Sequence, residues 1–157
     1  MSKAKHVPAA VAAAGNPNQA LVTAWVVQMI GTLVLTGVVL FFFRSTGAVI
    51  KGVDPQWALY ALYAATAAII PPLAYLQNFK RVLDLDRLGV TARGGTPDPD
   101  VRVFLMRALR VGGALCELPQ AFGVLHMLLG GETRWFLGAT VVTIALRFAY
   151  RPFEKLR

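Results

Sequence analysis

Residues 111–130 read VGGALCELPQAFGVLHMLLG, and this stretch decides the fold. It is mostly apolar and about twenty residues long, enough for a helix to cross roughly 30 Å of hydrocarbon. Glu117 lies inside it, and a charge at that depth costs about 2.5–3.5 kcal/mol on insertion scales, so Glu117 is a candidate functional residue. Pro119 lacks the N–H that would bond the Leu115 carbonyl, and we expect a free acceptor beside the carboxylate.

The composition of the whole chain favours a membrane protein. Of its 157 residues, 56% are hydrophobic and 15% are charged, whereas a soluble domain has about 25% charged residues. The apolar residues form four blocks, which predicts an all-α polytopic membrane protein with four transmembrane helices packed as two hairpins. The net charge of +8 comes from Lys and Arg at the span ends, as membrane topology requires, and argues against nucleic acid as a partner.

The predicted spans cover about residues 20–43, 56–78, 103–130 and 134–150, in one transmembrane domain of residues 20–151. A flexible cytoplasmic tail, residues 1–19, precedes this domain, and a short basic tail, residues 152–157, follows it. Pro71 and Pro72 are expected to kink the second span. Residues 80–88 are expected to extend that span as a helix, with Asp84, Asp86 and Arg87 exposed.

The positive residues predict the orientation of the spans. One side would carry Lys3, Lys5, Lys80, Arg81, Arg87, Arg93, Arg102, Arg151, Lys155 and Arg157, and the other Arg44, Lys51 and Arg134. The positive-inside rule then places both termini in the cytoplasm. This compact, cytoplasmically basic layout favours a cell inner membrane.

A polar face is predicted on the third span, where helical periodicity places Arg110, Glu117 and Gln120 together. If the following turn centres on Glu132, Arg147 of the fourth span lies opposite Glu117. We therefore expect an intramembrane ion pair of Glu117 with Arg147 or with Arg110. In the first span, Gln28 would either hydrogen bond to a neighbouring helix or bind a ligand.

Residues 117–125, ELPQAFGVL, resemble the ion-carrying helix of the proteolipid, or c, subunit of rotary ATP synthases. In that family an intramembrane glutamate is followed at plus five by an aromatic residue and at plus six by a small one, and Phe122 and Gly123 match these positions. The resemblance covers about ten of the 157 residues and implies an ion-binding role for Glu117 only. The chain departs from the family in its first span, which is not glycine-rich at alternate helical positions.

Two classes of function follow from these patterns. The first is a structural or accessory subunit of a larger membrane complex, in which Glu117 forms an internal ion pair. The second is a small transporter of protons, ions or a solute that acts as a homo-oligomer, with Glu117 as its titrating carboxylate. The chain lacks a Ser-His-Asp set, a Walker loop and a zinc cluster, so we expect neither an enzyme nor a metal site. His126 is the one histidine within a span, so no cofactor is expected.

Overall fold

The computed structural model describes residues 17–43, 49–92, 94 and 98–152 of the chain. All the regular secondary structure in these residues is helical: α1 (Pro17–Phe43), α2 (Gln56–Ala67), α3 (Ile70–Ala92), α4 (Pro99–Cys116), α5 (Leu118–Leu128) and α6 (Thr133–Ala149). The predicted all-α class is therefore confirmed for the described residues. Of the predicted tails, residues 1–16 and 153–157 lie outside them, as do Arg44 and Arg93, whereas residues 17–19 belong to α1.

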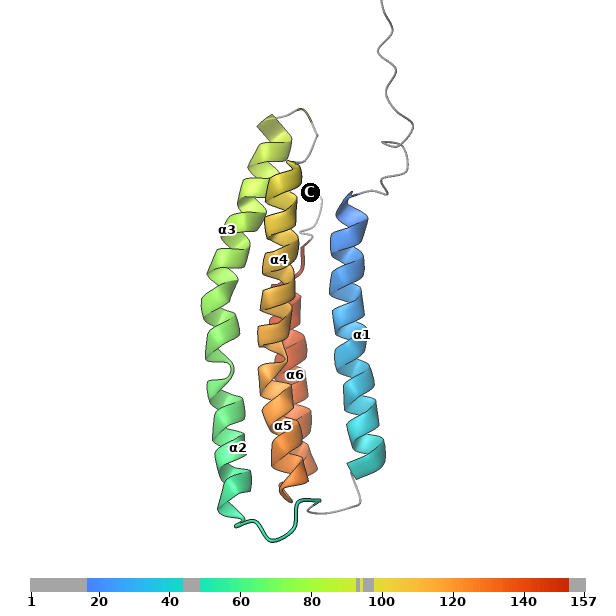
Figure 1. Cartoon of the computed structure of the whole chain (residues 1–157), viewed down its shortest axis with the longest axis vertical. Helices are drawn as coiled ribbons and strands as arrows, with labels where there is room; N and C mark the ends of the chain where they lie inside the picture. The colour runs from blue at the N-terminus through green and yellow to red at the C-terminus, as the bar shows by residue number, and fades with distance from the viewer. Residues whose placement is uncertain (1–16, 44–48, 93, 95–97, 153–157) are drawn as a thin grey trace, which may run out of the picture.

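The helices form long rods that lie side by side (Figure 1). Helices α2 and α3 stack end to end in one rod, and α4 and α5 do so in the next. Across the rods, α2 packs on α5, α3 packs on α4, and α6 packs on α5. Helix α1 begins at the same end of the molecule at which α6 finishes, so the two described chain ends lie at one end of the rods.

Both interrupted rods break just before proline residues. The α2–α3 break falls at Ala68 and Ile69, two residues before the Pro71-Pro72 pair that was predicted to kink this span. A proline two or three residues on cannot donate to the preceding turn, so the helical hydrogen bonding is interrupted there. This part of the chain confirms that the two prolines disturb the second rod.

The α4–α5 break falls at Glu117, two residues before Pro119. The Leu115 carbonyl, which we expected to be free, instead accepts a backbone N–H at the end of α4. That expectation was wrong because the last turn of α4 is tighter than an α-helical turn, so a backbone N–H closer along the chain than Pro119 bonds this carbonyl. Beyond the break, the Ala121 N–H bonds the Glu117 carbonyl at 2.9 Å, and the helix resumes.

The main hydrophobic core lies toward the end of the bundle that holds both described chain ends. Its buried side chains come from α1, α3, α4, α6 and the residue that caps α6: Leu21, Phe79, Leu83, Leu105, Ala108, Leu109, Cys116, Leu146 and Tyr150. The Tyr150 hydroxyl donates to the Pro72 carbonyl and thereby ties the end of α6 to the start of α3. Gly112 leaves room for the Tyr150 ring, because a Cβ there would lie 2.2 Å from a ring carbon. A smaller cluster, Val39, Met127 and Phe136, packs near the other end.

Two segments are long and apolar enough to cross a membrane: Gln19–Phe43 and Gln56–Ala92. Neither the α4–α5 rod nor α6, which has 17 residues, meets the same standard of length and apolar character. Only 11% of the residues in the most apolar stretch of the first segment are buried. The large apolar side chains exposed on α1 include Val27, Ile30, Leu33, Val34, Phe41 and Phe42.

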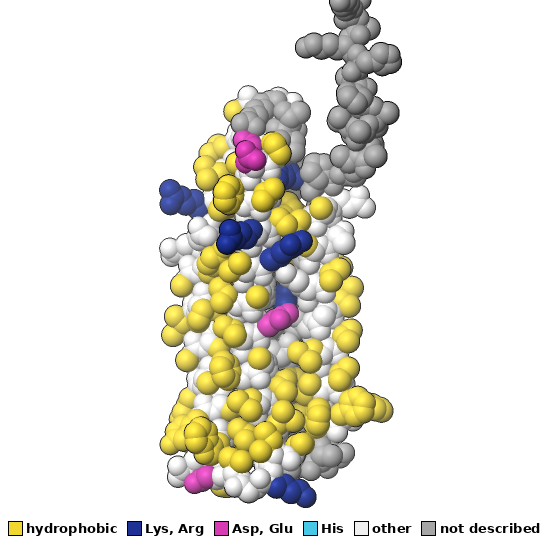
Figure 2. Space-filling model, in the orientation of Figure 1, with side chains coloured by type: hydrophobic (Ala, Val, Ile, Leu, Met, Phe, Trp, Pro, Cys, Tyr) yellow, Lys and Arg dark blue, Asp and Glu magenta, His cyan; other side chains and the backbone are white. Residues whose placement is uncertain are grey.

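Charged side chains are concentrated toward the two ends of the molecule, and one face between them is largely hydrophobic (Figure 2). Exposed apolar surface on this scale is rare on soluble monomers and marks contact with lipid or with another protein. An acidic side chain nevertheless lies part-way along this face, with a basic side chain behind it. This arrangement directs attention to the charges in the middle of the bundle.

Candidate functional site

The centre of the candidate site is Arg147, a residue of α6 whose side chain is only 1% exposed. Its Nη2 atom contacts Glu117 Oε1 at the junction of α4 and α5. Its Nη1 atom donates to Gln28 Oε1 of α1 at 3.0 Å. We call these three residues the Arg147 cluster. It joins three of the four rods through one guanidinium group, which can donate in several directions from a planar fork.

The two charged partners differ sharply in exposure. The Glu117 side chain is 53% exposed, whereas that of Arg147 is 1% exposed. Glu117 is the residue at which α4 ends and α5 begins, and its backbone angles are φ −79° and ψ −17°. The carboxylate therefore reaches inward from the surface of the bundle to a cation in the interior. One of its oxygens contacts Arg147, and the side chain keeps an outward-facing part.

Gln28 can approach Arg147 because the facing residue on α4 is a glycine. A Cβ at Gly113 would lie 2.2 Å from Gln28 Oε1, which is closer than real Cβ contacts allow. A second bond between α1 and α6 lies nearby, since Trp25 Nε1 donates to the Arg147 backbone carbonyl at 2.9 Å. Polar bonds thus attach α1, the helix with the most exposed apolar stretch, to the rest of the bundle.

Gln120 belongs to a separate polar contact. Its side chain is fully buried, and its Nε2 atom donates to Thr36 Oγ1 at 2.8 Å and to the Thr32 carbonyl at 3.2 Å. Both acceptors lie on α1, so Gln120 also holds that helix. It was predicted on the same face as Glu117, but its hydrogen bonds go to α1 threonines and not to the Arg147 cluster.

Of the two arginines considered as partners for Glu117, the structure brings only Arg147 to it. Arg110 is exposed on α4, and no salt bridge in the described part of the chain joins it to Glu117. The hairpin register explains the difference: α5 and α6 are antiparallel neighbours, so Arg147 returns to the depth of Glu117. Arg110, two turns earlier on its own rod, stays on the outer surface.

A second buried ion pair was missed at the sequence level. Asp86 was expected to be exposed but is 6% exposed, and its Oδ1 atom accepts from Arg102 Nε at 3.1 Å. The expectation was wrong because α3 continues to Ala92 and packs along α4, which covers this face of the helix.

His126 is also buried, and its Nδ1 atom donates to the Ala58 carbonyl at 2.7 Å, which links α5 to α2.

Comparison with protein-family models, with curated proteins and with solved structures finds no match to this chain. The function must therefore be argued from the geometry of the cluster.

The Arg147 cluster combines one cation, one anion and one amide, all from the same chain. Within the described residues, no group of three or more His, Cys, Asp or Glu side chains is placed to hold a metal ion. Among the described residues, one surface groove is lined in part by Asn78, a second by Trp135 and a third by Lys80. None of these grooves includes Gln28, Glu117 or Arg147. The cluster thus has the geometry of an interhelical tie, with one exposed side at Glu117.

Proposed function

We propose that the chain is a small multi-pass membrane protein in which all four rods cross the bilayer. Support comes from the two segments that are long and apolar enough to span, and from the exposed apolar side chains of α1 and α2. The α4–α5 rod would span despite its break, because the backbone groups freed near Pro119 are hydrogen bonded within the chain. The positive-inside rule favours an orientation with both termini in the cytoplasm, and the compact, cytoplasmically basic layout favours a cell inner membrane.

We propose that its role is that of a structural or accessory subunit in a larger membrane complex, and not that of an enzyme. The observation that carries this proposal is that both Nη atoms of Arg147 bond groups of its own chain, while its buried Nε atom has no hydrogen-bond partner among the described residues. A guanidinium held by a carboxylate and an amide from two other rods acts as a tie between helices. A charge pair used in this way fixes the arrangement of helices, which is the task of a scaffold.

The apolar surface of α1 supports the same role. The helix is fastened through polar atoms of Trp25, Gln28, Thr32 and Thr36, while most of its apolar side chains face outward. In a bilayer that surface is free to contact lipid or a helix of another subunit. A small protein with so much helix surface uncovered is well suited to dock against larger membrane partners.

Native mass spectrometry after gentle detergent extraction from the original membrane tests the accessory role. A heteromeric particle that contains the chain in fixed ratio to other subunits is the expected result. A homo-oligomer of defined copy number, with no other subunit present, would overturn the accessory role and favour the second proposal.

The second proposal is a small transporter of protons, ions or a solute, formed by several copies of the chain. The 53% exposure of the Glu117 side chain favours it, because a carboxylate that faces outward can meet a neighbouring copy. The resemblance of residues 117–125 to the ion-carrying helix of rotary ATP synthase c subunits points to the same residue. Its contact with Arg147 opposes it, since one carboxylate oxygen is already bonded within the same chain.

Glu117→Gln separates the two proposals in reconstituted vesicles and in membrane extracts. Under the transporter proposal, the variant assembles normally but loses proton or ion flux. Under the accessory proposal, it weakens the fold and lowers the yield of the complex. Arg110→Gln is the matched control, because it removes an exposed charge from the same rod without touching the Arg147 cluster.

A further inference from the structure

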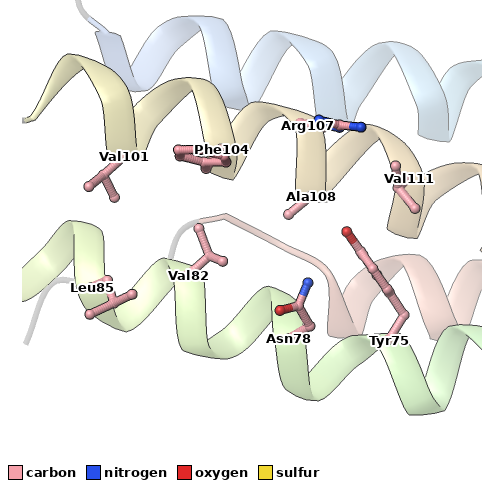
Figure 3. A pocket seen from close by; sticks show the side chains of 9 residues that line it. All are labelled: Tyr75, Asn78, Val82, Leu85, Val101, Phe104, Arg107, Ala108 and Val111. Carbon is pink, nitrogen blue, oxygen red and sulfur yellow. The ribbon is translucent and has the colours of Figure 1, made fainter.

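A groove of about 470 Å³ lies between α3 and α4, on the part of the bundle nearer the two described chain ends. It is separate from the Arg147 cluster. Val82, Leu85 and Phe104 contribute to its apolar wall, and Tyr75, Asn78 and Arg107 contribute polar groups. These polar residues come from both helices and lie toward the end of the groove that is nearer the middle of the rods (Figure 3).

The three polar side chains are all hydrogen-bond donors, and their donor groups are unused within the described part of the chain. The Tyr75 hydroxyl and the Asn78 amide point from α3 toward α4, and the Arg107 side chain lies along α4 (Figure 3). No hydrogen bond or salt bridge among the described residues involves these three groups, and Arg107 is exposed. A guanidinium beside a hydroxyl and an amide donor is suited to an anion with several oxygens, such as a phosphate.

The depth of these donors depends on the proposed membrane location, on which this inference rests. Gln28 lies near the middle of α1 and contacts Arg147, so the Arg147 cluster marks the middle of the bundle. Arg107 precedes Glu117 by ten residues in the same rod, which is about 15 Å at 1.5 Å per residue. Half of a bilayer's hydrocarbon is also about 15 Å thick. Arg107 therefore lies where lipid phosphates meet the hydrocarbon.

We infer that this groove binds an anionic phospholipid of the cytoplasmic leaflet, with its phosphate held by Arg107, Asn78 and Tyr75. Toward the middle of the bundle, exposed apolar side chains such as Val111 and Leu73 offer a path for an acyl chain. Basic pockets between helices on the cytoplasmic side recognise anionic headgroups in this way. A purely apolar partner helix would leave the guanidinium of Arg107 without a counter-charge.

Native mass spectrometry of the purified full chain with added lipids tests this inference. The chain is mixed in mild detergent with phosphatidylglycerol or with phosphatidylcholine, and the lipid retained is measured for the wild type, Arg107→Gln and Arg110→Gln. Arg110 is the matched control, since it is an exposed arginine one turn further along α4 that does not line the groove. Asn78→Leu removes a second donor without changing the charge.

We expect the wild type to retain phosphatidylglycerol in preference to phosphatidylcholine. Arg107→Gln should weaken phosphatidylglycerol binding roughly fivefold, the effect of one basic residue at a membrane surface. Asn78→Leu should weaken it less, and Arg110→Gln by under about twofold, because only the groove residues meet the phosphate. Equal losses in Arg107→Gln and Arg110→Gln would overturn the inference in favour of diffuse surface charge, and so would equal retention of the two lipids.

Extraction from the original membrane tests the accessory role separately. A purified chain that prefers phosphatidylglycerol through Arg107 supports the lipid site whether or not that extraction yields a heteromeric particle. A purified chain whose phosphatidylglycerol retention is unchanged by Arg107→Gln overturns the lipid site even if the heteromeric particle is found.

Discussion

Replacing Glu117 by glutamine removes the opposing charge from a guanidinium that is 1% exposed. The variant keeps a carbonyl oxygen close to Arg147 Nη2, and Gln28 still accepts from Nη1. The arginine therefore retains hydrogen bonds but loses the one charge that compensates its own. The reverse change, Arg147→Gln, removes the cation and the Gln28 bond together and leaves the Glu117 carboxylate half exposed in the apolar middle of the bundle.

The expected losses follow from the burial of Arg147. Removing one partner of a buried ion pair costs about 3–5 kcal/mol, because the other charge is left uncompensated. We expect Glu117→Gln at the low end, about 3 kcal/mol, since half of that side chain is exposed and Gln28 still bonds Arg147. Arg147→Gln should cost at least as much. The double variant leaves neither charge unpaired, so its loss should be at least about 2 kcal/mol smaller than the sum of the two single losses.

Reversible unfolding in mixed micelles, followed by the loss of helical circular dichroism, measures these free energies for the wild type and the three variants. Arg110→Gln serves as the control and should stay within about 0.5 kcal/mol of the wild type, as expected for an exposed surface position. Additive losses in the double variant would refute the reasoning, because they would show that Glu117 and Arg147 contribute independently. A single Glu117→Gln loss below about 0.5 kcal/mol would refute it as well, since no uncompensated charge would then be buried.

Three further predictions use the same unfolding measurement. Gly113→Ala should destabilise the bundle by about 1–3 kcal/mol, because the added Cβ would displace Gln28. Gly37→Ala is the control: its Cβ meets nothing within 4 Å, so this change should be neutral or stabilising. Equal effects of the two changes would contradict the close approach of α1 to α4. Tyr150→Phe should cost about 1 kcal/mol through the lost hydrogen bond to the Pro72 carbonyl, and an unchanged stability would show that this bond is not made. Asp86→Asn should cost more than Asp84→Asn, because Asp86 is buried against Arg102 while Asp84 is exposed; equal losses would contradict the burial of that pair.

The sequence predicted the features that depend on local chemistry. A proline in the interior of a helix interrupts its hydrogen bonding, so the disturbance before Pro71 followed from the sequence. Hairpin register depends on a turn position and a fixed rise per residue, so Arg147 was among the candidates for Glu117. A helical wheel also places Gln120 near Glu117, but it cannot tell which neighbouring rod each side chain meets. The threonine partners of Gln120 therefore came only from the packing of α1 against α5.

The sequence could not predict the features that depend on which helices touch. Asp86 follows a charged pattern typical of a solvated helix face, and only the contact of α3 with α4 buries it. The Leu115 carbonyl was expected to be free on the assumption of an unbroken helix, whereas the chain ends α4 at Cys116 and supplies another donor. Gly113 was the one sign in the sequence of a close helix contact, since a glycine on a polar helix face leaves room for a side chain of a neighbouring helix. It did not identify Gln28 as that partner.

The unequal exposure of Glu117 and Arg147 links the proposed functions to the surface of the bundle. A carboxylate that is half exposed midway along an apolar face is costly against lipid, and its inner partner neutralises only the side that faces inward. If the rods span a bilayer, the outer side of Glu117 is therefore covered by a polar group of another subunit, by a second copy of the chain or by water. The accessory role needs the first of these and the transporter role the second or third. The neighbours of Glu117 in the native membrane thus decide between the two proposals, and cross-linking from a photoreactive residue placed at Ala121, one turn further along α5 and exposed, would identify those neighbours directly.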